Sequence, residues 1–178
     1  MENKSIKRIS NARELCIFAM LGTVMYISKI VMEFLPNIHL LGVLTVVYTI
    51  VYRRKALIPI YIYVMLNGLL AGFNLWWLPY TYIWMILWGV VMLLPQNMTR
   101  KFAIPIYSIV CGVHGFAFGT LYAPAQALMF GLNFKQTVAW IITGIPFDVI
   151  HGISNLGLGL LIVPLSEILA KLSKRYTS

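Results

Sequence analysis

The chain has 178 residues, of which 60% are hydrophobic and only 11% are charged, and its mean hydropathy is +0.83. A soluble domain carries about 25% charged residues, so this composition excludes an ordinary soluble protein and indicates one membrane domain over residues 1–178. The formal net charge of +9 would also suit nucleic acid. The placement of the basic residues argues for a lipid bilayer and no nucleic acid.

Six apolar segments are candidates for membrane spans. They cover residues 15–34, 40–52, 56–73, 81–94, 102–122 and 137–163. Lipid admits helices or closed barrels, and continuous apolar runs without strict alternation favour helices. We therefore predict an all-α integral membrane protein with six transmembrane helices.

Lysine and arginine gather at every second boundary between these segments. The basic residues that follow this rule are Lys4, Lys7, Arg8, Arg13, Arg53, Arg54, Lys55, Arg100, Lys101, Lys171, Lys174 and Arg175. Lys29 and Lys135 do not follow it. The alternation is the positive-inside pattern and predicts that both termini are cytoplasmic. Because no small-residue cleavage site follows the first segment, we interpret it as an uncleaved helix.

The segments 40–52 and 81–94 are much shorter than the ~20 residues that cross ~30 Å of hydrocarbon. If the basic turns hold them at the inner face, they end below the outer surface. Irregular backbone at that depth is tolerated where it lines a cavity. The sequence thus predicts an outward-facing crater floored by residues 36–39 and 74–80. The alternative is that apolar loop residues extend these helices outward.

Aromatic residues crowd the stretch 73–84, which includes Trp76, Trp77, Tyr80 and Trp84. Tryptophan and tyrosine collect at headgroups or around ligand cavities. Because the expected topology places this stretch outside and below the surface, we interpret it as a crater wall. The connection 123–136 is long and apolar, as expected of a lid or of a short interfacial helix.

Polar residues within the sixth segment form a second candidate site. Asp148, His151 and Asn155 share one helix face, and His114 on the fifth segment is expected to meet them. They could contact substrate or perform proton-coupled chemistry, but an interhelical hydrogen-bond cluster is favoured. Pro146 is expected to kink this helix.

Two further patterns concern an ion pair and the packing of helices. Lys29 and Glu33, four residues apart, are expected to neutralise each other. Small residues with spacings that favour close helix approach are Ala19, Thr23, Gly68, Gly72, Gly115, Gly119 and Ala123. The sixth segment also has little side-chain bulk at Gly152, Gly157 and Gly159.

Neither a phosphate-binding loop of the G-x-x-x-x-G-K-[ST] type nor an H-E-x-x-H zinc pair occurs in the sequence. We therefore expect no ATP hydrolysis by this chain, no metal site and no catalytic residues.

Several stretches together resemble the substrate-binding S component of energy-coupling factor (ECF) vitamin transporters. They are Arg13-Glu14-Leu15-x-x-x-Ala19-x-x-x-Thr23, Leu35-Pro36-Asn37-Ile38-His39-Leu40-x-Gly42, Trp76-Trp77-Leu78-Pro79-Tyr80, Gly119-Thr120-Leu121-Tyr122-Ala123-Pro124-Ala125-Gln126-Ala127 and Pro146-Phe147-Asp148-x-x-His151-Gly152-x-Ser154-Asn155. The resemblance covers most of the chain and is greatest to the cobalamin type. The family typically has alanine where this chain has Thr23.

The resemblance implies a high-affinity vitamin-binding protein of a prokaryotic plasma membrane. It would associate with a membrane coupling subunit and two ATPase subunits, which use the ATP, and topple in the bilayer to release cobalamin or a cobalamin precursor. Ala19 and Thr23 would face the coupling subunit. The residues expected around the vitamin are Asn37, His39, Asn74, Trp76, Trp77, Tyr80, Tyr122, Gln126 and Trp140.

Three alternatives remain open at this point. The ligand could be folate, pantothenate or a queuosine precursor. The chain could be an intramembrane enzyme that uses Asp148, His151 and His114, or a scaffold that stabilises partner membrane proteins.

Overall fold

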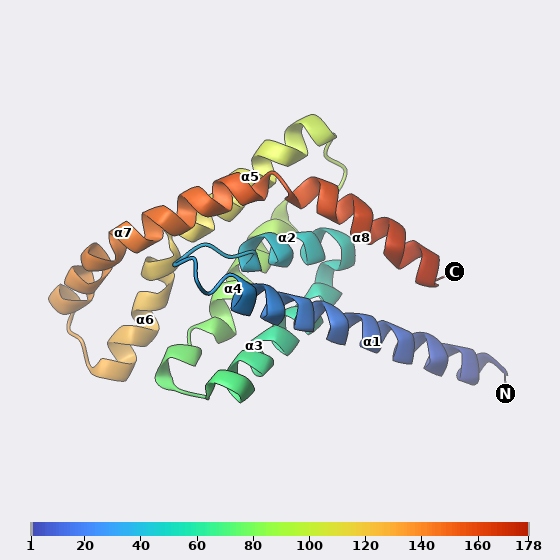
Figure 1. The fold of residues 1–178 in the computed structure, drawn as a ribbon, viewed down its shortest axis with the longest axis horizontal. Coiled ribbons are helices and arrows are strands. Elements are labelled where there is room, and N and C mark those ends of the chain that lie inside the picture. Colours follow the sequence, from blue (N-terminus) through green and yellow to red (C-terminus); the bar gives the residue numbers. More distant parts are fainter. Residues whose placement is uncertain (1, 178) are drawn as a thin grey trace.

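A computed structural model describes residues 2–177, with side chains over residues 12–174. Within this range the chain forms eight α-helices and two short 3-10 helices (Figure 1). They are α1 (Glu2–Val31), α2 (Leu41–Tyr52), η1 (Arg53–Ala56), α3 (Leu57–Ala71), η2 (Leu75–Trp77), α4 (Tyr80–Leu93), α5 (Arg100–Phe116), α6 (Phe118–Phe130), α7 (Phe134–Gly159) and α8 (Ile162–Thr177). The prediction of an all-α protein is confirmed.

Five segments of the described chain are long and apolar enough to cross a membrane. They are Ala12–Val31, Leu41–Ala71, Leu75–Leu93, Arg100–Phe130 and Phe134–Gly159. Large apolar side chains on them are exposed, including Leu69 at 64% and Leu128 at 86%, as expected where lipid is the solvent. The chain is a multi-span helical membrane protein.

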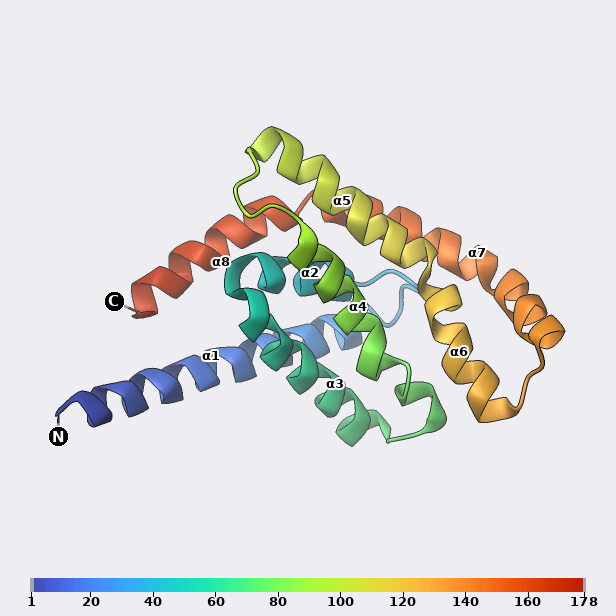
Figure 2. The same cartoon turned by 180° about the vertical axis from the view of Figure 1, so that it is seen from behind.

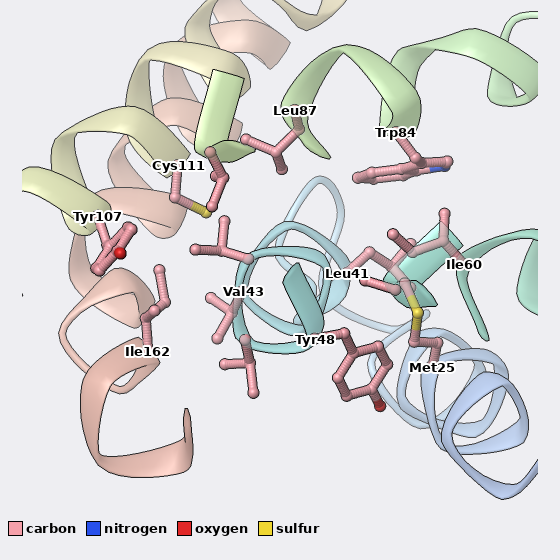
Figure 3. Close-up of a cluster of buried hydrophobic side chains, with 14 of the residues drawn as sticks. Met25, Leu41, Val43, Tyr48, Ile60, Trp84, Leu87, Tyr107, Cys111 and Ile162 are labelled. Carbon is pink, nitrogen blue, oxygen red and sulfur yellow. The ribbon is translucent and has the colours of Figure 1, made fainter. Parts of the chain in front are cut away.

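Helix α2 lies at the centre of the bundle. Its 12 residues extend over only ~18 Å, less than the ~30 Å of hydrocarbon. Figure 3 shows Val43 facing Cys111 and Ile162, while Tyr48 lies on the side of Met25. Neighbouring helices thus cover α2 on several sides, and most of the apolar core is built around it.

Two predicted segments end elsewhere than expected. The segment 102–122 ends its first helix at Phe116, the chain bends at Ala117, and α6 then covers most of the predicted connection 123–136. Residues 123–130 of that connection are therefore helical. Pro124 lies inside α6, so it does not end the helix.

The predicted segment 137–163 also divides. Helix α7 ends at Gly159, and α8 begins at Ile162. Apolar residues run through this break, so hydropathy alone could not locate it. The weak helix former Gly159 is the last residue of α7, and Pro164 lies in the first turn of α8, where proline is tolerated. Pro146 lies inside α7, which the structure describes as one helix.

Polar contacts tie the basic connections together at one end of the molecule, which we call the basic end. Lys55 Nζ lies 2.6 Å from Glu14 Oε1, Arg100 Nη1 lies 3.6 Å from Glu167 Oε2, and Arg53 Nη2 donates to Met92 O at 3.0 Å. These contacts join α1, η1, α4, α5 and α8. Both chain termini lie on this side in Figures 1 and 2, opposite the α6–α7 connection.

Uncharged contacts join the opposite end, which we call the aromatic end. Tyr82 Oη donates to Leu121 O at 2.8 Å, Tyr122 Oη donates to Trp76 O at 3.0 Å, and Ser154 Oγ donates to Asn37 O at 3.3 Å. They hold the α1–α2 and α3–α4 connections against α6 and α7. The candidate site lies at this end.

Candidate functional site

The first group of rings in the candidate site comes from the aromatic stretch before and within α4. Gly72 has a φ of +95°, which lets the chain turn after α3, and Pro79 precedes the first residue of α4. Trp76, Tyr80 and Trp84 then follow at intervals of four residues and share a face. Their ring centroids are 5.9 Å apart for Trp76 and Tyr80 and 6.1 Å apart for Tyr80 and Trp84.

The second group of rings comes from α6 and the start of α7. Phe118, directly after the bend at Ala117, lies 6.4 Å from Tyr80 and 6.0 Å from Trp84 between ring centroids. It also lies 6.4 Å from Tyr122, which stacks on Trp140 of α7 at 5.8 Å. Phe118 therefore joins the rings of α4 to those of α6 and α7.

Asp148 determines where Phe118 is held. Its Oδ1 accepts the backbone N–H of Gly119 at 2.9 Å, so a carboxylate of α7 caps the first turn of α6. A Cβ at position 119 would overlap this carboxylate, so a larger residue there would displace Asp148 from the Gly119 N–H. The predicted polar face of α7 thus has a structural role at Asp148.

Asn155 is the second interhelical contact on this face, and its Nδ2 donates to Cys111 O at 3.3 Å. The preferred interpretation of Asp148 and Asn155, hydrogen bonds that join helices, agrees with these contacts.

Unlike Asp148 and Asn155, the three histidines pack against the aromatic rings of the candidate site. His39 and His151 lie 4.6 Å apart, His151 lies 4.8 Å from Phe118, and His114 lies 5.8 Å from Trp84, measured between ring centroids. His114 is 6% exposed and His151 is 3% exposed. We call the set Trp76, Tyr80, Trp84, Phe118, Tyr122, Trp140, His39, His114 and His151 the aromatic cluster.

The hydrogen bond of His114 identifies its tautomer. Its Nε2 lies 3.2 Å from Ile83 O, and a carbonyl only accepts, so Nε2 carries the proton and Nδ1 carries a lone pair. His39 belongs to the connection between α1 and α2, and burial lowers its pKa from 6.5 to about 4. His39 is therefore neutral at pH 7.

Five of the nine residues expected around a ligand lie in the aromatic cluster, namely His39, Trp76, Tyr80, Tyr122 and Trp140. Trp77 points elsewhere, because its Nε1 donates to Val64 O at 2.8 Å and its ring packs on Phe73. The absence of a side chain at Gly68 leaves room for both rings.

The remaining three expected residues lie outside the cluster's ring contacts. Asn74 is exposed, Gln126 is half-buried on α6, and Asn37 contributes its backbone carbonyl to Ser154. The residues expected around the ligand did not include Phe118. Trp84 was expected only as part of the aromatic stretch 73–84, and His114 and His151 only as a possible substrate contact beside the favoured interhelical role. Trp84 follows Tyr80 by one helical turn, which is a usable signal, whereas nothing in the sequence marks Phe118.

Two further predictions concern α1. Lys29 Nζ lies 3.9 Å from Glu33 Oε1, which is the expected pairing. Ala19 and Thr23 are both exposed, and Thr23 Oγ1 donates to Ala19 O at 2.9 Å. These two small residues lie one turn apart on a face that the rest of the chain leaves uncovered.

Comparison with known proteins gives no relative. No family model matches the chain, and neither a curated protein nor a solved structure matches it. Over the described residues, no group of three or more histidine, cysteine, aspartate or glutamate side chains is placed to hold a metal ion.

Proposed function

We propose that the chain is the substrate-binding S component of an ECF-type importer for a vitamin, most closely of the cobalamin type. The observation that supports this best is the convergence of His39, Trp76, Tyr80, Tyr122 and Trp140. They come from separate segments of the chain and belong to one set of contacting rings at one end of a membrane protein. The sequence resemblance described above is the reason for proposing this family.

The chemistry of these rings suits a large, flat ligand with polar edges. Tryptophan and tyrosine offer wide apolar faces together with N–H and O–H groups, and neutral imidazole adds acceptors. Cobalamin, or a cobalamin precursor, has a planar ring system surrounded by amides. Folate, pantothenate and a queuosine precursor are the other ligands to be compared.

The proposed topology places the basic end in the cytoplasm. Counting α2 and α3 as separate crossings gives six crossings and returns both termini to the same side. The outward crater would then open at the aromatic end. Ala19 and Thr23, exposed on α1, would face the membrane coupling subunit, whose two ATPase subunits supply the energy.

Tryptophan fluorescence of the detergent-purified chain tests the proposal. Titration with cobalamin should change the emission with a saturable curve, and the Trp140→Phe variant should bind more weakly. Trp88→Phe is the matched control, because Trp88 Nε1 donates to Arg53 O at the basic end. Folate and pantothenate are titrated in the same way, and mass spectrometry identifies small molecules retained through purification. Unchanged emission with all three vitamins, together with no retained small molecule, would reject the proposal.

A further inference from the structure

Within the aromatic cluster and on the neighbouring residues Tyr63 and Asn67 lies a set of buried polar atoms that have no hydrogen-bond partner within the described chain. They are Tyr63 Oη, Asn67 Nδ2 and Oδ1, Trp84 Nε1, His114 Nδ1, His39 Nδ1 and His151 Nε2. We call these seven atoms the inner polar set. Tyr63 and Asn67 are 0% exposed and Trp84 is 1% exposed, so the bulk solvent does not reach their side chains.

The residues of the inner polar set are neighbours. Tyr63 lies 6.2 Å from Trp84, and His39 also lies 6.2 Å from Trp84, between ring centroids. His114 lies next to Trp84 and His151 next to His39, as described above. Asn67 follows Tyr63 by four residues on α3, so the two share a helix face. Four helices and the α1–α2 connection therefore contribute to one region.

Comparable buried polar groups elsewhere in the fold have hydrogen-bond partners. Tyr48 Oη donates to Leu21 O at 3.0 Å, and Trp88 Nε1 donates to Arg53 O at 3.1 Å. A buried donor or acceptor without a partner is destabilising, and native structures contain few of them. The inner polar set holds seven of the eleven such atoms over the described residues. This concentration beside a ring cluster indicates a binding site.

The donors and acceptors of the set define the chemistry that it recognises. Trp84 Nε1 only donates, His114 Nδ1 only accepts, and Tyr63 and Asn67 can do both. All belong to uncharged side chains. A carboxylate would accept from Trp84 but would leave His114 Nδ1 without a donor and would bury a charge among neutral groups. An amide or a nitrogen heterocycle both donates and accepts without a charge.

We propose that the inner polar set is the subsite for an uncharged amide or nitrogen-heterocycle group of the ligand. The rest of the ligand lies against the aromatic cluster. This inference rests on the proposed function, since it names the part of the vitamin that enters deepest. It favours ligands with an amide or heterocyclic end over ligands that are recognised through an acidic end.

A binding role and a structural role predict opposite effects of the same substitution. Tyr63→Phe removes one oxygen that has no partner in the empty protein, so the empty protein should unfold at the same or a higher temperature. Ligand binding should nevertheless weaken by about threefold to tenfold, the usual effect of one lost neutral hydrogen bond. A merely structural hydroxyl would lower the unfolding temperature and leave affinity unchanged.

Two further variants make the test specific. His114→Gln keeps an N–H group that can reach Ile83 O but removes the Nδ1 acceptor, so it should weaken binding while the fold is retained. Tyr48→Phe is the matched control, because Tyr48 is 2% exposed and its hydroxyl has a partner. This control should lower the unfolding temperature and leave affinity unchanged.

Affinities are measured by fluorescence titration with cobalamin, folate and pantothenate, and thermal unfolding is followed without ligand. Weaker binding in Tyr63→Phe and His114→Gln, but not in Tyr48→Phe, supports the subsite. Unchanged affinity in both variants, with a vitamin bound by the unsubstituted chain, overturns the subsite and leaves the proposed function standing. A chain that binds none of the three vitamins and retains no small molecule overturns both.

Discussion

His39 illustrates how a loop residue becomes part of the interior. It belongs to the connection between α1 and α2, yet its ring lies 4.6 Å from His151 and 6.2 Å from Trp84 between centroids. Asn37, two residues earlier, adopts a φ of +60° and holds the turn through its carbonyl, which accepts from Ser154. Because burial disfavours the charged imidazole, protonation of His39 opposes the folded arrangement.

This leads to a prediction about pH. The pKa of His39 is about 4 in the folded chain and 6.5 when unperturbed, so between these values the unfolded chain binds a proton that the folded chain does not. Stability that is present above pH 6.5 is therefore lost as the pH falls towards 4, by about 3 kcal/mol. Thermal unfolding at pH 7.5 and pH 4.5 measures the loss.

The control is His39→Gln, which cannot take up a proton. The unsubstituted chain should lose more stability than this variant between the two pH values. Equal losses would show that the ring of His39 is not protected from protonation by burial.

Among the helices, α5 and α7 form the closest pair. They run side by side in Figure 2, and glycines lie between them. A Cβ at Gly115 would lie 2.9 Å from both Gly152 Cα and His151 O, and a Cβ at Gly159 would lie 2.7 Å from Ser108 Cα. Backbone atoms cannot move aside as side chains do, so these positions need glycine. Gly157 faces open space and takes no part.

The two kinds of glycine predict opposite stability changes. Gly115→Ala should destabilise the chain by about 1–3 kcal/mol, because the added methyl group pushes α5 away from α7. Gly157→Ala should stabilise it by up to about 1 kcal/mol, because alanine is the better helix former and meets nothing. Thermal unfolding in one detergent compares the two variants. A stabilising Gly115→Ala would mean that the helices are farther apart than described.

At the scale of the whole molecule, two of the three ion pairs of the described residues lie at the basic end, and the third, Lys29–Glu33, lies at the end of α1 that leads to His39. Contacts of Glu14, Arg53, Lys55, Arg100 and Glu167 lie at the basic end, and the ring contacts lie at the aromatic end. Lys135, at the start of α7, is an exposed cation beyond the basic end. By the positive-inside rule, this distribution predicts that the basic end faces the cytoplasm.

Cysteine labelling in intact cells tests the orientation. Cys16 and Cys111 are first replaced, by serine and alanine, and a single cysteine is introduced as Lys135→Cys or Lys55→Cys. A membrane-impermeant maleimide should label the first variant in intact cells and the second only after lysis. The opposite result would invert the proposed topology and place the aromatic end in the cytoplasm.

The features that the sequence predicts best are the helix bounds that depend on the surrounding lipid and water. Hydropathy and charge placed α2, α3, α4, the end of α1 and the starts of α5 and α7 within a few residues, because lipid imposes long apolar runs with basic ends. The bend at Ala117 and the break between α7 and α8 were not predicted. The bend at Ala117 involves a contact from a distant part of the chain, Asp148 against Gly119, which no local pattern records. The break after Gly159 lies within continuous apolar residues, where hydropathy marks no boundary.

Many residues of the candidate site could be predicted from the sequence, but the way in which their side chains pack could not. The stretch around Trp76 and Tyr80 was identified from its aromatic content, yet Trp76 and Trp77 are adjacent in sequence and point to different neighbours. The assignment of the three histidines to the same cluster requires the packing of α5, α7 and the α1–α2 connection. Periodicity within one helix cannot supply this packing.

The short helix α2 has a consequence for how the protein is made. Neighbours that enclose α2 include α8, whose Ile162 and Val163 belong to the same core as Val43 and Val46. Ribosomes deliver α2 early and α8 only at the far end of the described chain. Until α8 arrives, α2 lacks part of its enclosure, and its ends lie too close together to reach both headgroup layers. Assembly in the bilayer therefore finishes only after translation has passed α8, and a nascent chain stalled before that point should be a target for quality-control proteases.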